Sequence, residues 1–185
     1  MVLDANQTGG TVTDFLDRLA ARSPTPAGGS VAALCTAQAA ALVAMVARFC
    51  GSDLVVEAAE ELVARGVQLA ADDEESFGSV AAAWDIPRDD PSRRTAIDAA
   101  LLGAAEPQAR VVETAVEVLV LIDRLRPSAR AGLAADLVAA GEVAKAGAAI
   151  ARMNVESNLS TLPDSEERAG MLRRMGVART MGKRT

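Results

Sequence analysis

The chain has 185 residues, of which 50% are hydrophobic and only 2% aromatic, and its formal net charge is −6. Alanine contributes 40 residues, which favours helices, because Ala has the highest helix propensity whereas strands prefer β-branched and aromatic side chains. The absence of histidine excludes Ser-His-Asp and Cys-His triads and the usual His-built zinc sites. We therefore predict an all-α fold: one domain over 1–185, a bundle of six to seven helices, some of them long, with an Ala-rich central helix.

The N-terminal part of the chain predicts two helices joined by a loop. Thr11 and Asp14 have the spacing of a capping box and open a helix that ends near residue 22. Residues 23–29 read Ser-Pro-Thr-Pro-Ala-Gly-Gly, which is typical of a loop, and Ser30 is expected to cap an apolar helix that ends near Cys50. This uncharged stretch is long enough to span a membrane, but its Ala, Thr and Gln content favours a buried helix in a soluble bundle instead.

The rest of the chain is expected to contain four further long helices and a shorter C-terminal piece. Gly51-Ser52-Asp53 ends the apolar helix and starts the next one, and the prolines that follow mark turns or helix starts. No segment alternates with period two over a useful length, so we expect no sheet. The expected helices lie at 53–84, 92–105, 107–126 and 129–152, with the amphipathic piece after Pro163.

One face of the 53–84 helix gives the sharpest local signal. Asp73 interrupts an otherwise apolar stripe, read in steps of three and four residues, beside two of the four aromatic side chains. An unpaired buried carboxylate is costly, so Asp73 is either paired by an Arg or a helix end, or raised in pKa and suited to proton transfer. Periodicity leaves both interpretations open. The stripe consists of Leu62, Gly66, Leu69, Asp73, Phe77, Val80 and Trp84.

The loop over 23–29 and the start of the following helix form a second candidate site. Two prolines stiffen the approach and two glycines let the backbone come close to another group. A helix N-terminus offers free N–H groups and a positive dipole end to a carboxylate or phosphate. The alternative is a tight helix-to-helix turn. The candidate binding residues are Ser23, Thr25, Pro26, Gly28, Gly29 and Ser30.

The last long helix contributes a third group of polar residues. Asp136 and Asn154 are 18 residues apart, which is five turns, so they share one azimuth but lie roughly 27 Å apart in a straight helix. Either the helix breaks near Arg152 or its two ends serve different places. The alternative for Asn154 and Asn158 is a helix-end cap, and for Gln38 a satisfied core amide.

The charge is unevenly distributed, because residues 168–185 hold six basic side chains and no acidic one. We expect this tail to be solvated or frayed, as chain ends usually are. The acidic remainder has few aromatic residues, so we expect no nucleic-acid or membrane partner. With no secretory signal pattern and two isolated cysteines that match no metal spacing, we expect a cytoplasmic protein without a metal site.

Several sequence blocks, taken in order, carry a family resemblance. The most specific is Phe15-Leu16 followed by Ser-Pro-Thr-Pro-Ala-Gly-Gly-Ser-Val-Ala-Ala-Leu over 23–34. The order resembles the cyclodeaminase/cyclohydrolase family of folate enzymes, which includes the C-terminal domain of formiminotransferase-cyclodeaminase and methenyltetrahydrofolate cyclohydrolase. The resemblance covers about 13–162, the expected core. Weaker blocks are Asp73-Glu-Glu-Ser-Phe77, Arg94-Thr-Ala-Ile97, Ala104-Ala-Glu-Pro107, Asp136-Leu137 and Asn154-Val-Glu-Ser-Asn158-Leu159.

The resemblance implies an all-helical homodimer that acts on a one-carbon derivative of tetrahydrofolate without a tightly bound cofactor. The implied reaction is either methenyltetrahydrofolate cyclohydrolase or formiminotetrahydrofolate cyclodeaminase. Asp73 or Asp136 would supply acid/base catalysis and stabilise a cationic carbon. The start of the apolar helix would receive a polar end of the folate, with Asn154 and Asn158 as orienting hydrogen-bonders. An acidic chain that binds an acidic folate tail also needs a local arginine, for which the candidates are Arg18, Arg22 and Arg48.

Two positions depart from the family pattern. Ala27 replaces the first glycine of a loop that usually reads Pro-Gly-Gly-Gly-Ser, and Ala135 precedes Asp136 where serine is common. These departures motivate an alternative of another class, a non-catalytic helical dimer that binds a folate or a protein partner.

Overall fold

The computed structural model describes residues 10–181, with side chains up to residue 176, and this part of the chain contains no strand. The all-α prediction is therefore confirmed. The elements are α1 (Val12–Ala20), α2 (Gly28–Cys50), α3 (Asp53–Asp85), α4 (Arg93–Leu125), the 3₁₀ turn η1 (Ala131–Leu133), α5 (Ala134–Leu159) and α6 (Glu166–Met181).

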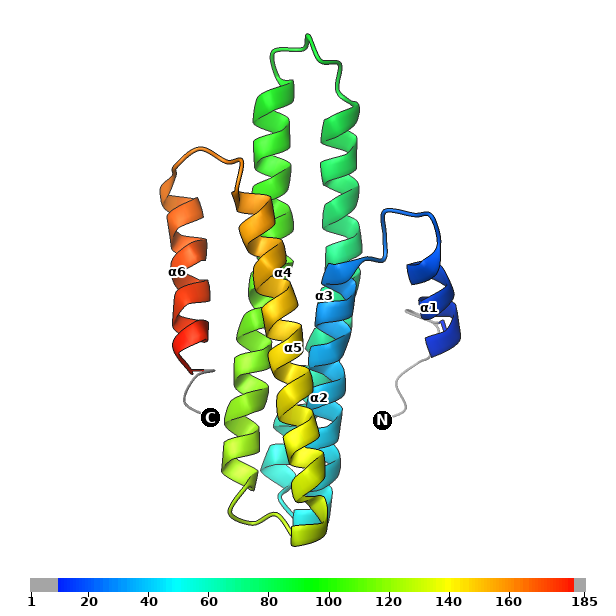
Figure 1. Ribbon diagram of the computed structural model, residues 1–185, viewed down its shortest axis with the longest axis vertical. Helices are drawn as coiled ribbons and strands as arrows, with labels where there is room; N and C mark the ends of the chain where they lie inside the picture. The colour runs from blue at the N-terminus through cyan, green and yellow to red at the C-terminus, as the bar shows by residue number, and fades with distance from the viewer. Residues whose placement is uncertain (1–9, 182–185) are drawn as a thin grey trace.

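Four of these helices form the bundle. Helices α2, α3, α4 and α5 pack lengthwise against one another, while α6 lies beside α4 and α1 stands away on the opposite side (Figure 1). The hairpin made by α3 and α4 projects beyond the start of α2 and the end of α5 (Figure 1). The N-terminus of α2 therefore meets the hairpin partway along its length, which decides where the site lies.

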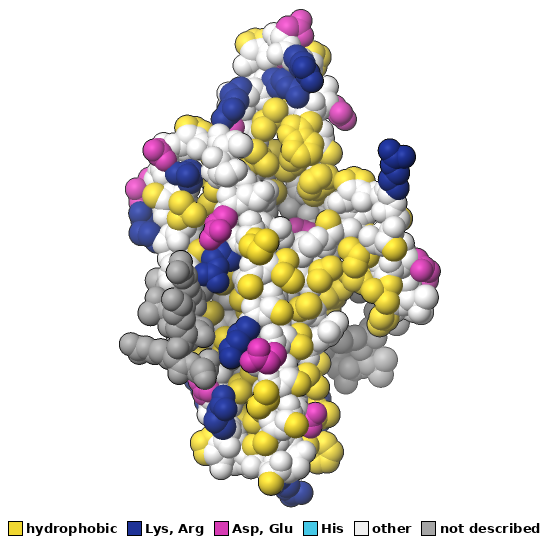
Figure 2. Space-filling view, viewed as in Figure 1, with side chains coloured by type: hydrophobic (Ala, Val, Ile, Leu, Met, Phe, Trp, Pro, Cys, Tyr) yellow, Lys and Arg dark blue, Asp and Glu magenta, His cyan; other side chains and the backbone are white. Residues whose placement is uncertain are grey.

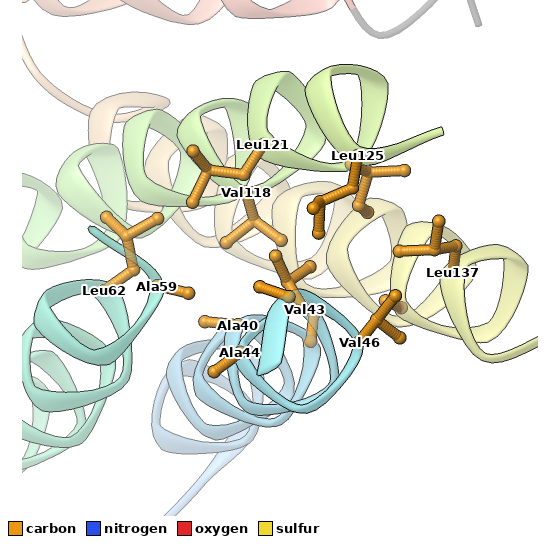
Figure 3. Close-up of a cluster of buried hydrophobic side chains, with 14 of the residues drawn as sticks. Ala40, Val43, Ala44, Val46, Ala59, Leu62, Val118, Leu121, Leu125 and Leu137 are labelled. Carbon is orange, nitrogen blue, oxygen red and sulfur yellow. The ribbon is translucent and has the colours of Figure 1, made fainter. Parts of the chain in front are cut away.

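The Ala-rich α2 is the central helix, and its small side chains let its neighbours approach closely. A Cβ on Gly66 of α3 would lie 2.9 Å from the Cβ of Ala37, and one on Gly147 of α5 would lie 2.8 Å from the carbonyl oxygen of Ala32. By length and composition α2 qualifies as a membrane span, but 61% of its apolar window is buried against the other helices, as in the core helix of a bundle. Toward the far end of the bundle, branched side chains from four helices interdigitate around it (Figure 3).

Two expectations about helix boundaries are wrong. Pro107 lies inside the continuous helix α4 rather than opening a new one. A proline in a helix interior removes one backbone hydrogen bond and costs about 3 kcal/mol, which the burial of Pro107 and its neighbours against the bundle offsets. Helix α5 likewise runs through Arg152 without a break and ends at Leu159.

The expectation of a solvated basic tail is wrong for residues 168–176. Met171 and Met175 of α6 are buried against α4. Arg174 donates to Glu106 at 2.7 Å and to Glu113 at 2.8 Å, so the acidic partner of this segment is the chain's own helix α4. The side chains of residues 177–185 lie outside the described part.

Candidate functional site

The carboxylate of Asp73 on α3 meets the first turn of α2. The hydroxyl of Ser30 donates to Asp73 Oδ2 at 3.0 Å, and the amide Nε2 of Gln108 on α4 donates to Asp73 Oδ1 at 2.7 Å. Ser30 and Gln108 are 0% and 1% exposed. Both carboxylate oxygens are thus held by neutral donors from two different helices.

The second glycine of the loop motif makes this approach possible. A Cβ on Gly29 would lie 2.2 Å from Asp73 Oδ1, far inside contact distance, so only glycine fits between the helix backbone and the carboxylate. A Cβ on Gly28 would lie 3.9 Å from Asn154 Nδ2, which is an ordinary contact. The two glycines therefore have different roles, and only Gly29 is required by the site.

The start of α2 differs from the prediction that Ser30 is its cap. The helix begins three residues earlier than predicted, at Gly28, and Ala27 at the cap position makes no side-chain hydrogen bond. Asp73 takes over this role from a neighbouring helix, because its negative charge lies where the free N–H groups and the positive dipole end of α2 point. The Ser30 hydroxyl is consequently free to bind Asp73.

Burial raises the pKa of Asp73, and this effect outweighs the hydrogen bonds from the Ser30 hydroxyl, the Gln108 amide and the Ser30 backbone N–H, which lower it. Among the described side chains, the ion pairs leave Asp73 without an Arg or Lys partner. Each interpretation of Asp73 holds in part, because the carboxylate is paired with a helix end, without an arginine among the described side chains, and its pKa is nevertheless raised. Such a carboxylate is a stronger base than an ordinary one, and a nearby cationic ligand would stabilise its charged form.

Gln108 connects Asp73 to α5. Its Oε1 accepts a hydrogen bond from Asn154 Nδ2 at 3.4 Å, so a single amide bridges two of the predicted site residues. Gln108 was not identified from the sequence, although the sequence contains a usable signal. The Gln108 amide interrupts the apolar stripe of α4, just as the Asp73 carboxylate interrupts the apolar stripe of α3. Asn158 lies one turn beyond Asn154 and is half-buried.

Asp136 lies apart from this cluster. It stands in the first turn of α5, and the helix is continuous to Asn154, so the two residues are roughly 27 Å apart along its axis. The alternative in which the helix breaks near Arg152 is therefore wrong, and a separate role for each end of α5 stays a prediction. Ala135, beside Asp136, is exposed.

The remaining candidates lie on the approach to the site or along a neighbouring groove. In the loop, the Ser23 hydroxyl donates to the Thr25 carbonyl at 2.9 Å, and Pro26 is buried. Gln38 is exposed rather than a core amide, and it lines a groove of about 900 Å³ between α1, α2 and α3. No group of three or more His, Cys, Asp or Glu residues suited to a metal ion occurs in the described part.

The three arginines considered for a folate tail lie in different places. Arg18 of α1 donates to Glu74, the sequence neighbour of Asp73, at 2.6 Å and stands at the edge of the groove. Arg48 lies in the last turn of α2, away from the Asp73 end, where it pairs with Glu60. Arg22 is exposed on the loop between α1 and α2. Arg18 is therefore the one tied to the α3 segment that carries Asp73.

Comparison with known proteins shows what this arrangement is related to. The chain is 32% identical over 176 residues to methenyltetrahydrofolate cyclohydrolase of Methylorubrum extorquens, a match that covers 85% of each chain. Its fold resembles the crystal structure of formiminotetrahydrofolate cyclodeaminase from Thermotoga maritima, with a TM-score of 0.87 and 26% identity over 95% of this chain and 91% of the other. Residues 11–176 match the family described as formiminotransferase-cyclodeaminase. The chain, with its carboxylate held at the start of a central Ala-rich helix, therefore belongs to the formiminotransferase-cyclodeaminase family.

Proposed function

We propose that this chain is a folate one-carbon enzyme that acts on the N5/N10 bridge of tetrahydrofolate, with methenyltetrahydrofolate cyclohydrolase as its activity. The observation that carries the proposal is the half-buried Asp73 carboxylate, which is hydrogen-bonded on both oxygens and lacks a cationic partner among the described side chains. The methenyl bridge is an amidinium cation, so its carbon is the kind of ligand that such a carboxylate favours. The relation to the Methylorubrum extorquens cyclohydrolase supports the same reaction.

The proposed mechanism uses Asp73 twice. As a carboxylate it accepts a proton from the water whose oxygen bonds to the cationic bridge carbon, which gives a tetrahedral carbon between two nitrogens. The protonated Asp73 then returns that proton to the nitrogen that leaves as one C–N bond breaks. The remaining hydroxyl proton is released to solvent, and the bridge carbon becomes a formyl group. A raised pKa suits the first step, because it makes the carboxylate a stronger base than an ordinary one.

Ser30, Gln108 and Asn154 have supporting roles in this proposal. The first two fix the carboxylate in one orientation, since each holds a different oxygen. Asn154 sits at the rim, with its amide bonded to Gln108 and its remaining hydrogen-bonding capacity available to orient the substrate. Asp136 lies too far away to touch the same bridge carbon within one chain.

A second candidate is formiminotetrahydrofolate cyclodeaminase, which the structural likeness to the Thermotoga maritima enzyme favours. In that reaction N10 attacks the formimino carbon on N5 and ammonia leaves. The same carboxylate would accept the proton from N10 and deliver it to the departing nitrogen. Both reactions pass through a tetrahedral carbon flanked by nitrogens, so the geometry of Asp73 serves either.

The test is to mix the purified protein separately with methenyltetrahydrofolate and formiminotetrahydrofolate and to follow the methenyl chromophore by absorbance. We expect wild type to consume the chromophore of the first compound. Asp73→Asn should leave the chromophore intact while its circular dichroism spectrum stays that of wild type. Appearance of the chromophore with the second compound would identify the deaminase instead. Folate-dependent thermal stabilisation without turnover of either compound would identify the non-catalytic binding protein.

We also propose a cytoplasmic homodimer. Helix α1 supports the dimer, because it has no buried residue and its Val12 and Leu16 side chains are 77% and 53% exposed. A second copy that covers this apolar face would remove it from water. Sedimentation equilibrium of the purified chain tests the dimer, and a monomer at micromolar concentration would contradict it.

A further inference from the structure

The apolar stripe of α3 changes character at Asp73. On the N-terminal side of Asp73, Leu69 is 1% exposed and packs into the core with Ala32 and Ala33 of α2. On the C-terminal side, α2 no longer covers the stripe, because that helix begins at Gly28 and the hairpin projects past it (Figure 1). The part of the stripe beyond Asp73 is therefore not covered by α2 (Figure 1).

Two aromatic side chains occupy the uncovered part of the stripe. Phe77 lies one turn beyond Asp73, about 6 Å along the helix axis, and Trp84 lies two turns further on. Their rings touch edge to face, with centroids 5.9 Å apart and an interplanar angle of 80°. Trp84 is 48% exposed and Phe77 is half-buried, so the pair presents ring surface to solvent.

The projecting part of the hairpin carries an apolar surface (Figure 2). Figure 2 shows hydrophobic side chains gathered over the projecting part of the hairpin, above a hollow at whose floor acidic atoms are visible. The chain has only three Phe, one Trp and no Tyr, so two of its four aromatic residues form a contact one turn or more beyond the half-buried carboxylate. Exposed aromatic surface costs free energy in water, and a stacking ligand would recover it.

We infer that Phe77 and Trp84 form an aryl subsite, which holds the p-aminobenzoyl ring of the folate while the bridge carbon lies at Asp73. The inference rests on the proposed function, because that substrate carries an aryl ring bonded directly to N10, one bond from the bridge. On the same stripe Leu69 is buried, and Ser30 and Gln108 contact the Asp73 carboxylate from α2 and α4, so the uncovered surface next to Asp73 is the part that carries Phe77. The ring is therefore directed toward Phe77, and the glutamate tail continues along the hairpin past Trp84.

The composition of the chain makes a direct experiment possible. Trp84 is the only tryptophan and there is no tyrosine, so the fluorescence of the protein reports on this subsite alone. The probe is p-aminobenzoylglutamate, which carries the ring and the tail but no pterin and cannot react. We expect this probe to change the Trp84 emission of wild type and of Asp73→Asn in a saturable way. In Phe77→Leu the amplitude of that emission change should fall by at least half.

Kinetics give a second measurement that a structural role alone would not reproduce. Phe77→Leu and Trp84→Leu should each raise the KM for methenyltetrahydrofolate by roughly three- to tenfold, the worth of an aromatic contact, with kcat nearly unchanged. Phe49→Leu is the matched control, because Phe49 is 57% exposed at the opposite end of α2 and should leave both constants as in wild type.

The outcomes separate the two proposals. Turnover by wild type, with Trp84 emission unmoved by the probe and KM unchanged in both variants, overturns the aryl subsite and leaves the proposed function standing. Absence of turnover together with unmoved emission overturns both. A shift in sedimentation of Trp84→Leu toward a smaller species would show that a second copy of the chain covers the aromatic pair, and it also overturns the subsite.

Discussion

Replacing Gly29 by alanine tests whether the close approach of α2 to Asp73 is required for function. The added Cβ would lie 2.2 Å from Asp73 Oδ1 and 2.5 Å from both Cγ and Oδ2, whereas ordinary contacts begin at 3.4 Å. The carboxylate must therefore retreat by about 1.2 Å. That movement breaks its hydrogen bonds with Ser30 and Gln108, and a misplacement of about 1 Å at a catalytic group can cost roughly 100-fold in rate.

Gly28→Ala is the matched control, because its Cβ meets nothing closer than 3.9 Å. We expect Gly29→Ala to lose roughly 100-fold in kcat/KM for methenyltetrahydrofolate, measured by chromophore loss. Overpacking should also cost about 1–3 kcal/mol, which for a chain of this size lowers Tm by roughly 2–12 °C. Gly28→Ala should keep both activity and Tm. If the two variants have the same kcat/KM within threefold, the carboxylate is not held as argued.

Four further changes probe the site and the bundle. Asp73→Asn should raise Tm at neutral pH. A carboxyl whose pKa is raised in the folded protein stabilises the fold below its ordinary pKa of 3.8, and this contribution is lost as the pH rises through the folded pKa. A Tm gain that is equal at acid and neutral pH would contradict this reasoning. Gln108→Leu removes a donor that lowers the pKa of Asp73, so the acid limb of the pH–kcat/KM profile should move to higher pH, and an unmoved limb would refute the assignment. Gly147→Ala should lower the free energy of unfolding, measured by chemical denaturation, by about 1–3 kcal/mol, because the new Cβ would lie 2.8 Å from a backbone oxygen of α2. The control Gly78→Ala, at an exposed helix position, should raise it by about 0.5–1 kcal/mol, and equal values for the two variants would show that α2 and α5 can separate freely. Arg174→Met keeps the apolar stem but loses two glutamate partners on α4, so we expect the free energy of unfolding to fall by about 1–2 kcal/mol and proteolysis within α6 to be faster. Unchanged proteolysis would show that the buried methionines alone hold this helix in place.

Local sequence features predicted the helices whose signals are short-range. The capping box of Thr11 and Asp14 is present at the start of α1, with the Thr11 side chain bound to the Asp14 backbone and the Asp14 carboxylate bound to the Thr11 backbone. The helix predicted at 53–84 is observed at Asp53–Asp85. Such features involve residues only three to four positions apart, so they do not depend on which other helices pack nearby.

Features that depend on a distant partner were not predictable in the same way. Pro107 reads locally as a helix start, and only its burial in the bundle keeps α4 continuous. Ser30 reads locally as a cap, but Asp73 from α3 takes that place. The basic segment around Arg174 reads as a solvated tail until α4 supplies its acidic partners.

The sequence by itself therefore determined three things: an all-helical chain, chemistry without histidine, and Asp73 as the carboxylate on an apolar face. Alanine content and helical periodicity are sufficient for these, since both act within a few turns. Only the tertiary structure decided that Asp73 meets Ser30 and Gln108 while Asp136 stays roughly 27 Å from Asn154 along α5. The physical reason is that close packing of glycine and alanine fixes which helix faces meet, and a site made from three helices exists only once they do.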